Sequence, residues 1–263
     1  MLELVTSGDR WSAAGGTDAT RGLFVKELEE ALLDGRADIA VHSAKDLPGE
    51  LPQGLAILAV PEREDPRDVL IGPVGGLAGL APGARVGTGS PRRSAQLLIA
   101  RPDVTCVEIR GNVGTRIDKL RQGGVADALV LAAAGLARLG LAPVDVTPLE
   151  VEVSVPAPGQ GALAIEGRAD RPELRDALRV LDHAQTAACV MAERALLAAL
   201  GGGCREPIGA LAICDGEMVT LTGFAASEDR SRHARETIGG SVGQAERLGT
   251  ELAGTLAAAI ARP

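Results

Sequence analysis

Apolar runs that end in glycine or polar residues alternate with helical patterns along most of the chain. The helical pattern LFVKELEEALLDG precedes the strand-like run ADIAVHS, ARVGTGS precedes the helical SPRRSAQLLIAR, and NVGTRIDKLRQG precedes DALVLAAAGLARLG. Such alternation is typical of α/β proteins, because each helix must cover an apolar face of the sheet that its neighbouring strands form. We therefore expect an α/β fold with parallel strands.

Two segments are predicted to cross between domains. The first is the charged stretch PEREDPRD at 61–68, and the second is the proline- and glycine-rich VPAPGQGAL at 155–163. Beyond them, a helical stretch over 172–200, the strand-like GALAICDG and MVTLTGFAA, and a helix over 242–261 predict a small α+β domain. The expected domain boundaries are 1–62 with 160–180 for the first domain, 66–156 for the second and 184–263 for the third.

Composition narrows the class of protein. The 263 residues are 46% hydrophobic with a net charge of −8, which argues for a globular protein and against general nucleic-acid binding. The chain has no apolar run of about 18 residues and no signal-peptide pattern at its start, so we expect a cytoplasmic protein without a membrane partner. Four cysteines without a CxxC pair, beside three histidines, predict neither a disulfide framework nor a metal site.

Positive charge gathers in one part of this acidic chain. Residues 85–121 hold eight basic side chains against three acidic ones. Within them Ser90 can cap a helix whose first turn contains Arg92 and Arg93, and cations in a first turn oppose the helix dipole unless an anion lies among them. An external anion is therefore expected there, although a solvated basic surface is the alternative. The nearby Gly-x-Gly is too short to predict a dinucleotide site.

A second junction between a strand and a helix, IRGNVGTRIDKL, repeats this arrangement with Arg110 and Arg116. In doubly wound folds, loops at the carboxyl ends of strands bind ligands. Arginine is suited to bidentate recognition of carboxylates or phosphates. The four arginines together predict a ligand with several such groups.

An acid and a base follow another strand. DIAVHS runs into Lys45 and Asp46, and Lys45 is one of only three lysines beside 24 arginines. For Asp46 the alternative is a turn or cap before Pro48. His42 alone is interpreted as a core or turn histidine.

Cys204 differs from the other cysteines in its surroundings. It lies in LGGGCREP, where glycines expose the backbone and Arg205 adjoins the sulfur, so reactive and inert thiols are both open interpretations. Cys106, Cys189 and Cys214 fall in strand or helix patterns, and we expect them to serve in packing.

Six motifs together carry a family resemblance. They are HSAKDLP at 42–48, EREDPRD at 62–68, VGTGSPRR at 86–93, RGNVGTR at 110–116, PAPGQGALAIE at 156–166 and ERALLAALGGGCREP at 193–207. In order and spacing the chain resembles the porphobilinogen deaminases, also called hydroxymethylbilane synthases. The resemblance implies two lobes like those of periplasmic binding proteins and a third domain whose cysteine, here Cys204, carries a covalent dipyrromethane. It also implies a monomer that condenses four porphobilinogen molecules head to tail onto this primer, releases ammonia at each addition and frees hydroxymethylbilane.

The resemblance also implies roles for individual residues. Asp46 matches the catalytic aspartate, which stabilises the positive charge that develops as ammonia leaves. Arg138 and Gln160 match peripheral substrate-binding positions. The positions that hold the acetate and propionate groups of cofactor and substrate match Ser43, Lys45, Thr88, Ser90, Arg92, Arg93, Arg110 and Arg116.

The start of the chain departs from the family pattern. The family opens with a strand and a helix that contain a Gly-Thr-Arg-x-Ser motif, and the first lobe is expected to lack both. A truncated, non-catalytic module that binds carboxylates is therefore the alternative hypothesis. Cys204 and Asp46 favour the enzyme, because a binding module needs neither an attachment thiol nor a charge-stabilising acid. A nucleotide-binding enzyme is a poorer interpretation, because no phosphate loop is complete.

Overall fold

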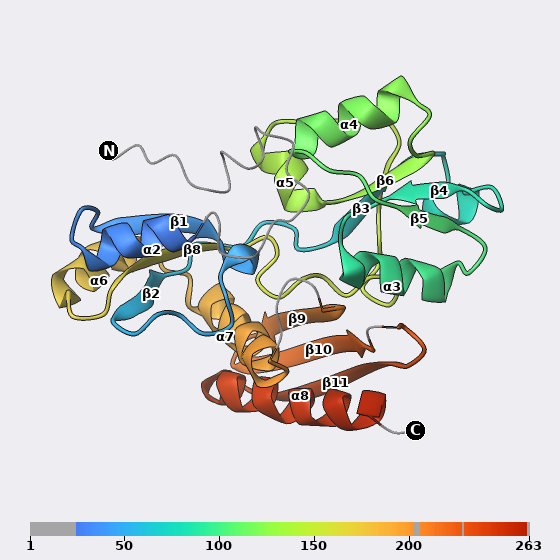
Figure 1. Ribbon diagram of the computed structural model, residues 1–263. Coiled ribbons are helices and arrows are strands. Elements are labelled where there is room, and N and C mark those ends of the chain that lie inside the picture. Colours follow the sequence, from blue (N-terminus) through green and yellow to red (C-terminus); the bar gives the residue numbers. More distant parts are fainter. Residues whose placement is uncertain (1–24, 202–205, 228, 262–263) are drawn as a thin grey trace.

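The computed structural model describes residues 25–201, 206–227 and 229–261, which form an α/β protein with three β-sheets (Figure 1). Two mixed α/β units lie side by side, and a third sheet with its own helices lies below them in this view. No helix in the described part of the chain is both long enough and apolar enough to cross a membrane.

The first sheet has the order β1-β8-β2. Its central strand β8 (Leu163–Arg168) pairs antiparallel with both β1 (Ile39–Ser43) and β2 (Leu55–Ala59). The predicted parallel arrangement is wrong for these strands, because β8 enters the sheet from the second crossing and runs back along its two neighbours. Helix α2 (Lys26–Leu33) covers one face through Leu32, which packs with the buried side chains of β1 and β2.

The second sheet has five strands in the order β5-β4-β6-β3-β7. Here β4 (Arg85–Gly87) is parallel to β5 (Thr105–Val107) and β6 (Ala128–Ala132), as predicted. The other two strands, β3 (Asp68–Ile71) and β7 (Val146–Pro148), run antiparallel to their neighbours. The helices of this unit are α3 (Pro91–Ala100), α4 (Val113–Gln122) and α5 (Ala133–Arg138).

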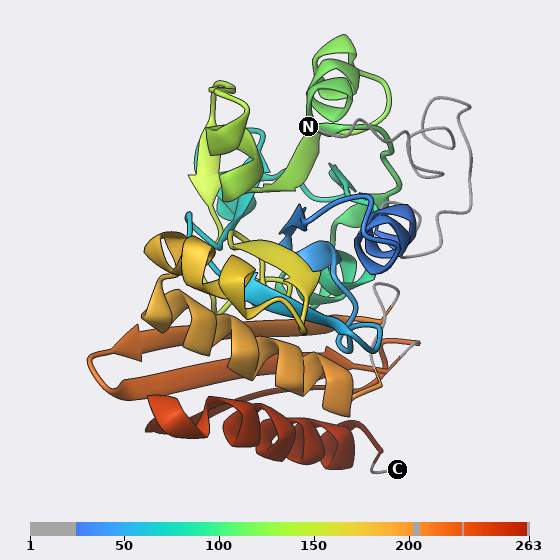
Figure 2. The ribbon, with the colours of Figure 1, turned by 90° about the vertical axis from the view of Figure 1, so that its left-hand side faces the viewer.

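The third sheet is antiparallel and has the order β11-β10-β9. Its strands are β9 (Ile208–Asp215), β10 (Met218–Ala226) and β11 (His233–Ser241), and helices α7 (Ala184–Ala199) and α8 (Ala245–Ala261) pack against it (Figure 2). The two helices approach closely at Gly249, where a Cβ would lie 2.8 Å from the backbone nitrogen of Leu196. Strand β11 was not predicted, because most of its side chains are polar and exposed and give no apolar alternation.

The helix predicted over 172–200 is interrupted. Helix α6 (Pro172–Leu178) ends in a short 3-10 turn, and α7 begins at Ala184. Two side chains account for the break. Asp182 accepts a hydrogen bond from the backbone N–H of Val60 at 2.8 Å, and the imidazole of His183 accepts one from the N–H of Thr186. These bonds fix the start of α7 against the end of β2.

The two predicted crossings lie against each other. The N–H of Glu64 donates to the carbonyl of Gly161 at 3.1 Å, and Nε of Arg63 donates to the carbonyl of Gln160 at 2.8 Å. Gly161 has φ +86°, and a Cβ there would lie 2.5 Å from the carbonyl oxygen of Glu64, so only glycine fits. The paired crossings bring the end of β1 close to the start of β3.

Candidate functional site

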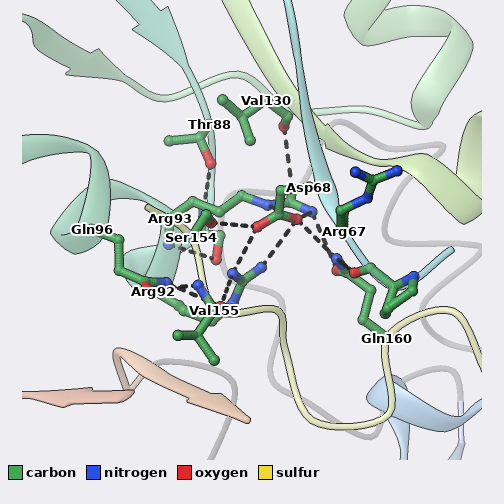
Figure 3. Close-up of polar contacts among 12 residues, drawn as sticks. Arg67, Asp68, Thr88, Arg92, Arg93, Gln96, Val130, Ser154, Val155 and Gln160 are labelled. Atoms are coloured by element: carbon green, nitrogen blue, oxygen red, sulfur yellow. Dashed lines mark hydrogen bonds and ion pairs between the residues drawn. The ribbon is translucent and has the colours of Figure 1, made fainter. Parts of the chain in front are cut away.

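A buried carboxylate lies at the centre of a polar network where β3, α3 and the second crossing meet (Figure 3). This is Asp68, which is fully buried. Its Oδ1 accepts hydrogen bonds from Nη2 of Arg93 at 2.7 Å and from Nε2 of Gln160 at 2.9 Å. Its Oδ2 accepts from Nη1 of Arg92 at 2.7 Å and from the hydroxyl of Ser154 at 2.8 Å. Both oxygens are therefore fully bonded.

The charges in this network do not cancel. Burial by itself raises the pKa of Asp68, but the charges and hydrogen bonds of Arg92 and Arg93 outweigh it and hold that pKa well below its usual range. The carboxylate is therefore ionised at physiological pH. One carboxylate against two guanidinium groups leaves an excess positive charge in the buried network.

Helix α3 begins as predicted, with a different counter-ion. The hydroxyl of Ser90 accepts from the N–H of Arg93 at 3.5 Å, which confirms the predicted cap. The sequence predicted an external anion beside the two first-turn arginines. In the structure, the carboxylate of Asp68 pairs with both of them. Arg92 is 4% exposed and also donates to the carbonyl of Val155 at 2.7 Å, so it faces inward.

Lys45 and Asp46 reach this network from the first sheet. They lie in a 3-10 turn (Ala44–Asp46) that directly follows β1. Nζ of Lys45 is 3.4 Å from Oε1 of Gln160, and the same oxygen accepts from Nη2 of Arg93 at 3.4 Å. Burial and then the charge of Arg93 lower the pKa of Lys45 to about 8. Asp46 is exposed, and its charge favours the protonated form of Lys45.

The remaining predicted arginines occupy different surroundings. Nε of Arg116 donates to the carbonyl of Gly111 at 2.6 Å, and burial followed by the charge of Arg93 lowers the pKa of Arg116. Arg116 therefore shares the electrostatic environment of Arg93. Arg110, by contrast, forms an exposed pair with Glu108. Nη2 of Arg138 donates to the carbonyl of Gly161 at 2.7 Å and so supports the second crossing.

The predicted hydroxyl groups lie at the ends of two strands. Thr88 follows β4, is buried, and accepts a hydrogen bond from the N–H of Ser90 at 3.2 Å. Ser43 is the last residue of β1 and is partly buried. These positions lie next to the arginines of α3 and to Lys45, respectively.

A second buried acid, Glu193 of α7, was missed by the sequence interpretation. Its carboxylate accepts from Nη1 of Arg63 at 2.6 Å, from the N–H of Gly159 at 2.6 Å and from the N–H of Ala212 at 2.7 Å. These partners lie in the first crossing, the second crossing and β9. Glu193 and Asp68 both fall within the quoted motifs, but no local pattern around them separates a buried acid from an exposed one.

Cys204 lies outside the described residues, so its predicted role stays a prediction. Cys189 and Cys106 pack against apolar clusters, as expected. His42 is buried, as its interpretation as a core histidine required, with Nε2 2.9 Å from Oε2 of Glu166. Within the described ranges, no three histidine, cysteine, aspartate or glutamate side chains group together as a possible metal site.

An α/β protein with surplus cationic groups between its sheets is a protein suited to bind carboxylates. Two family models match most of the chain. Residues 1–176 match the family model for the porphobilinogen deaminase dipyromethane cofactor binding domain, and residues 187–258 match that for the porphobilinogen deaminase C-terminal domain.

Relatives match along nearly the whole chain. The porphobilinogen deaminase of Trichlorobacter lovleyi is 49% identical over 98% of this chain and 83% of its own length. That of Geobacter sulfurreducens is 51% identical over 98% of this chain and 81% of its own. A solved periplasmic binding protein of Salmonella typhimurium aligns with 60% of this chain and 70% of its own, with a TM-score of 0.35 and 16% identity.

The chain therefore belongs to the porphobilinogen deaminase family. It has porphobilinogen deaminase activity, also called hydroxymethylbilane synthase activity, in tetrapyrrole biosynthesis. Its cofactor is dipyrromethane. The residues fit this group, because the acetate and propionate side chains of its pyrroles would offset the positive charge that Arg93 places on Lys45 and Arg116.

Replacing Asp68 by asparagine should leave two buried guanidinium groups without a counter-charge. We expect the free energy of unfolding to fall by about 3 to 5 kcal/mol, because breaking a buried ion pair on one side leaves an uncompensated charge. Ser154→Ala, which removes one hydrogen bond from the same carboxylate, should cost only about 1 kcal/mol. Denaturant unfolding monitored by circular dichroism measures both, and equal losses for the two variants would contradict the assigned ionic role.

Proposed function

We propose that the cluster around Arg93, Lys45 and Gln160 is the site at which porphobilinogen units are condensed onto the dipyrromethane primer. One observation carries this proposal: cationic side chains from two different α/β units, Arg93 of α3 and Lys45 of the turn after β1, meet at a single amide oxygen, Oε1 of Gln160. A pyrrole with two carboxylates can bridge such a pair of cations. The bridging would hold a pyrrole ring between the first and second sheets.

Asp46 is proposed as the catalytic acid. It is exposed at the end of β1, next to the amine of Lys45, and is therefore accessible to a bound pyrrole. Its carboxylate would stabilise the positive charge that develops on the substrate as ammonia departs, and would accept hydrogen bonds from pyrrole N–H groups. The adjoining Lys45 would fix the orientation of a substrate carboxylate beside it.

The predicted carboxylate-binding residues divide into two roles. Arg93, Arg116 and Lys45 are proposed to contact carboxylates, because burial and then the charge of Arg93 lower the pKa of the other two, and an anion would relieve the repulsion. Arg92 is proposed as a positioning residue, because its guanidinium is bonded to Asp68 and Val155. Arg93 is also bonded to Asp68, but it is distinguished by its contact with the Gln160 amide that Lys45 reaches. Further contacts are proposed from Ser43, Thr88, Ser90 and Arg110, with Arg138 and Gln160 peripheral.

The wider organisation follows the family expectation. We propose the domain boundaries 1–62 with 160–180, 66–156 and 184–263, in which the first two units correspond to lobes of the periplasmic-binding-protein kind. Each boundary lies near one of the paired crossings or the break before α7. A cytoplasmic monomer is proposed as the working state.

Cys204 is proposed to carry the dipyrromethane through a thioether. Intact-mass measurement of protein purified from a host that makes porphobilinogen should show the added mass of two linked pyrroles. The added mass should be absent from Cys204→Ser and present in Cys106→Ser, which is the matched control. A wild-type chain without the addition would contradict the proposal and favour a binding module.

Substitution of Asp46 tests the catalytic role. We expect Asp46→Ala to lose nearly all turnover of porphobilinogen while the primer stays attached, because the developing positive charge loses its partner. Glu50→Ala removes an exposed carboxylate four residues away and should keep normal turnover. Turnover is measured by hydroxymethylbilane formation and primer content by intact mass. Normal turnover in Asp46→Ala would refute the assignment.

The lowered pKa of Lys45 predicts pH-dependent substrate binding. Binding of a carboxylate uses the protonated amine, so affinity should fall as pH rises through about 8. Between about pH 7 and about pH 9 we expect KM for porphobilinogen to rise about tenfold, in line with the fraction of protonated amine. In Lys45→Arg the side chain stays charged, and this rise should disappear. The same rise in Lys45→Arg would show that another group is responsible.

The lowered pKa of Lys45 affects the stability of the fold in the opposite direction to its effect on substrate binding. The folded-state pKa of Lys45 lies below its ordinary value of 10.5, so the unfolded chain binds more protons between these two values. The contribution of Lys45 to the free energy of unfolding therefore rises with pH from about 8 to 10.5. Stability and carboxylate binding thus respond to pH in opposite directions at this residue.

A further inference from the structure

Two cysteines lie together where α7 passes over β9. Sγ of Cys189 is 3.3 Å from Sγ of Cys214, and both are free thiols. A disulfide has an S–S length of about 2.05 Å, so closing the bond requires a movement of only about 1.3 Å. The sequence predicted packing roles for both residues. We propose that Cys189 and Cys214 are a redox-active dithiol. Small disulfides oxidise it to a Cys189–Cys214 disulfide, and thiols reduce it again.

A cavity gives access to this pair. It has a volume of about 350 Å³, and its lining includes both cysteines together with Arg63, Pro66, His183 and Gln185. Cys214 is partly exposed, whereas Cys189 is 6% exposed. A small disulfide can therefore reach Cys214 from the cavity before it reaches Cys189.

The surroundings of the two sulfurs indicate the order of attack. Burial, and then the hydrogen bond and charge of Cys214, raise the pKa of the Cys189 thiol to about 12. Cys189 is therefore a poor first nucleophile. Cys214 is the better placed of the two, because it is partly exposed and lines the cavity, where its Sγ lies 3.5 Å from the carbonyl oxygen of Gln185. Once Cys214 is bonded to another sulfur it can no longer carry a negative charge, so its charge no longer raises the pKa of Cys189, although the effect of burial remains.

The reaction is two thiol–disulfide exchanges. The Cys214 thiolate attacks one sulfur of a low-molecular-weight disulfide RSSR, which gives a mixed disulfide and releases RS⁻. Cys189 then loses its proton to solvent and attacks Sγ of Cys214, which releases the second RS⁻. In total the two protein thiols lose two electrons and two protons, and RSSR becomes two molecules of RSH.

The proposal is tested on the full chain with bis(2-hydroxyethyl) disulfide as the oxidant. After reaction, free thiols are alkylated and unreduced peptides are mapped by mass spectrometry. We expect a Cys189–Cys214 cross-link that dithiothreitol reverses. It should form at least about tenfold faster in the folded protein than in denaturant, because the fold holds the two sulfurs together.

Two variants separate the steps. Cys189→Ser should accumulate a mixed disulfide on Cys214, because the second attack is no longer possible. Cys214→Ser should react slowly, because the remaining thiol is buried. Cys106→Ser should behave as wild type. The proposal is overturned if Cys214 reacts in the folded wild type without forming the link, or if the link appears only after unfolding.

Discussion

The ion pair between Asp68 and the two arginines of α3 is the interaction on which the rest of the site depends. Two adjacent cations in the first turn of a helix are unfavourable, and two buried guanidinium groups more so. A single carboxylate from β3 satisfies both. The arrangement orients the arginines, fixes the start of α3 against β3, and leaves one positive charge over. The residues that hold this part of the structure together therefore lie within the site proposed to bind the ligand.

Glu193 is a second buried carboxylate that joins separate segments, in this case the third sheet and the two crossings. It is fully buried and accepts hydrogen bonds from Arg63, Gly159 and Ala212, which belong to three different segments. Because a buried acid that lacks its partners is unfavourable, these hydrogen bonds hold the three segments together around the carboxylate. The helix that precedes the Cys204 segment in the sequence is thereby tied to the crossings that carry Gln160.

The sequence was informative where local chemistry decides the structure. Short-range patterns predicted the cap at Ser90 and the helices α3 and α4. They also predicted the strand that leads to Lys45 and Asp46. The antiparallel pairing of β8 depends on contacts far apart in the chain, and no local pattern encodes strand direction. The ion pairs of Asp68 could not be predicted either, because its partner arginines lie 24 and 25 positions away in the chain. The break before α7 was missed for a similar reason, since Asp182 is held by Val60.

The close pairing of the two crossings restricts how the molecule can move. Gly159 and Gly161 have positive φ angles and approach the backbone at Ala44 and Glu64 so closely that no side chain fits. Arg63 and Glu64 add hydrogen bonds along the same stretch. These contacts couple the two crossings, so a movement of one crossing must carry the other with it. Any shift of one α/β unit against the other that accommodates a growing chain of pyrroles would therefore bend both crossings together.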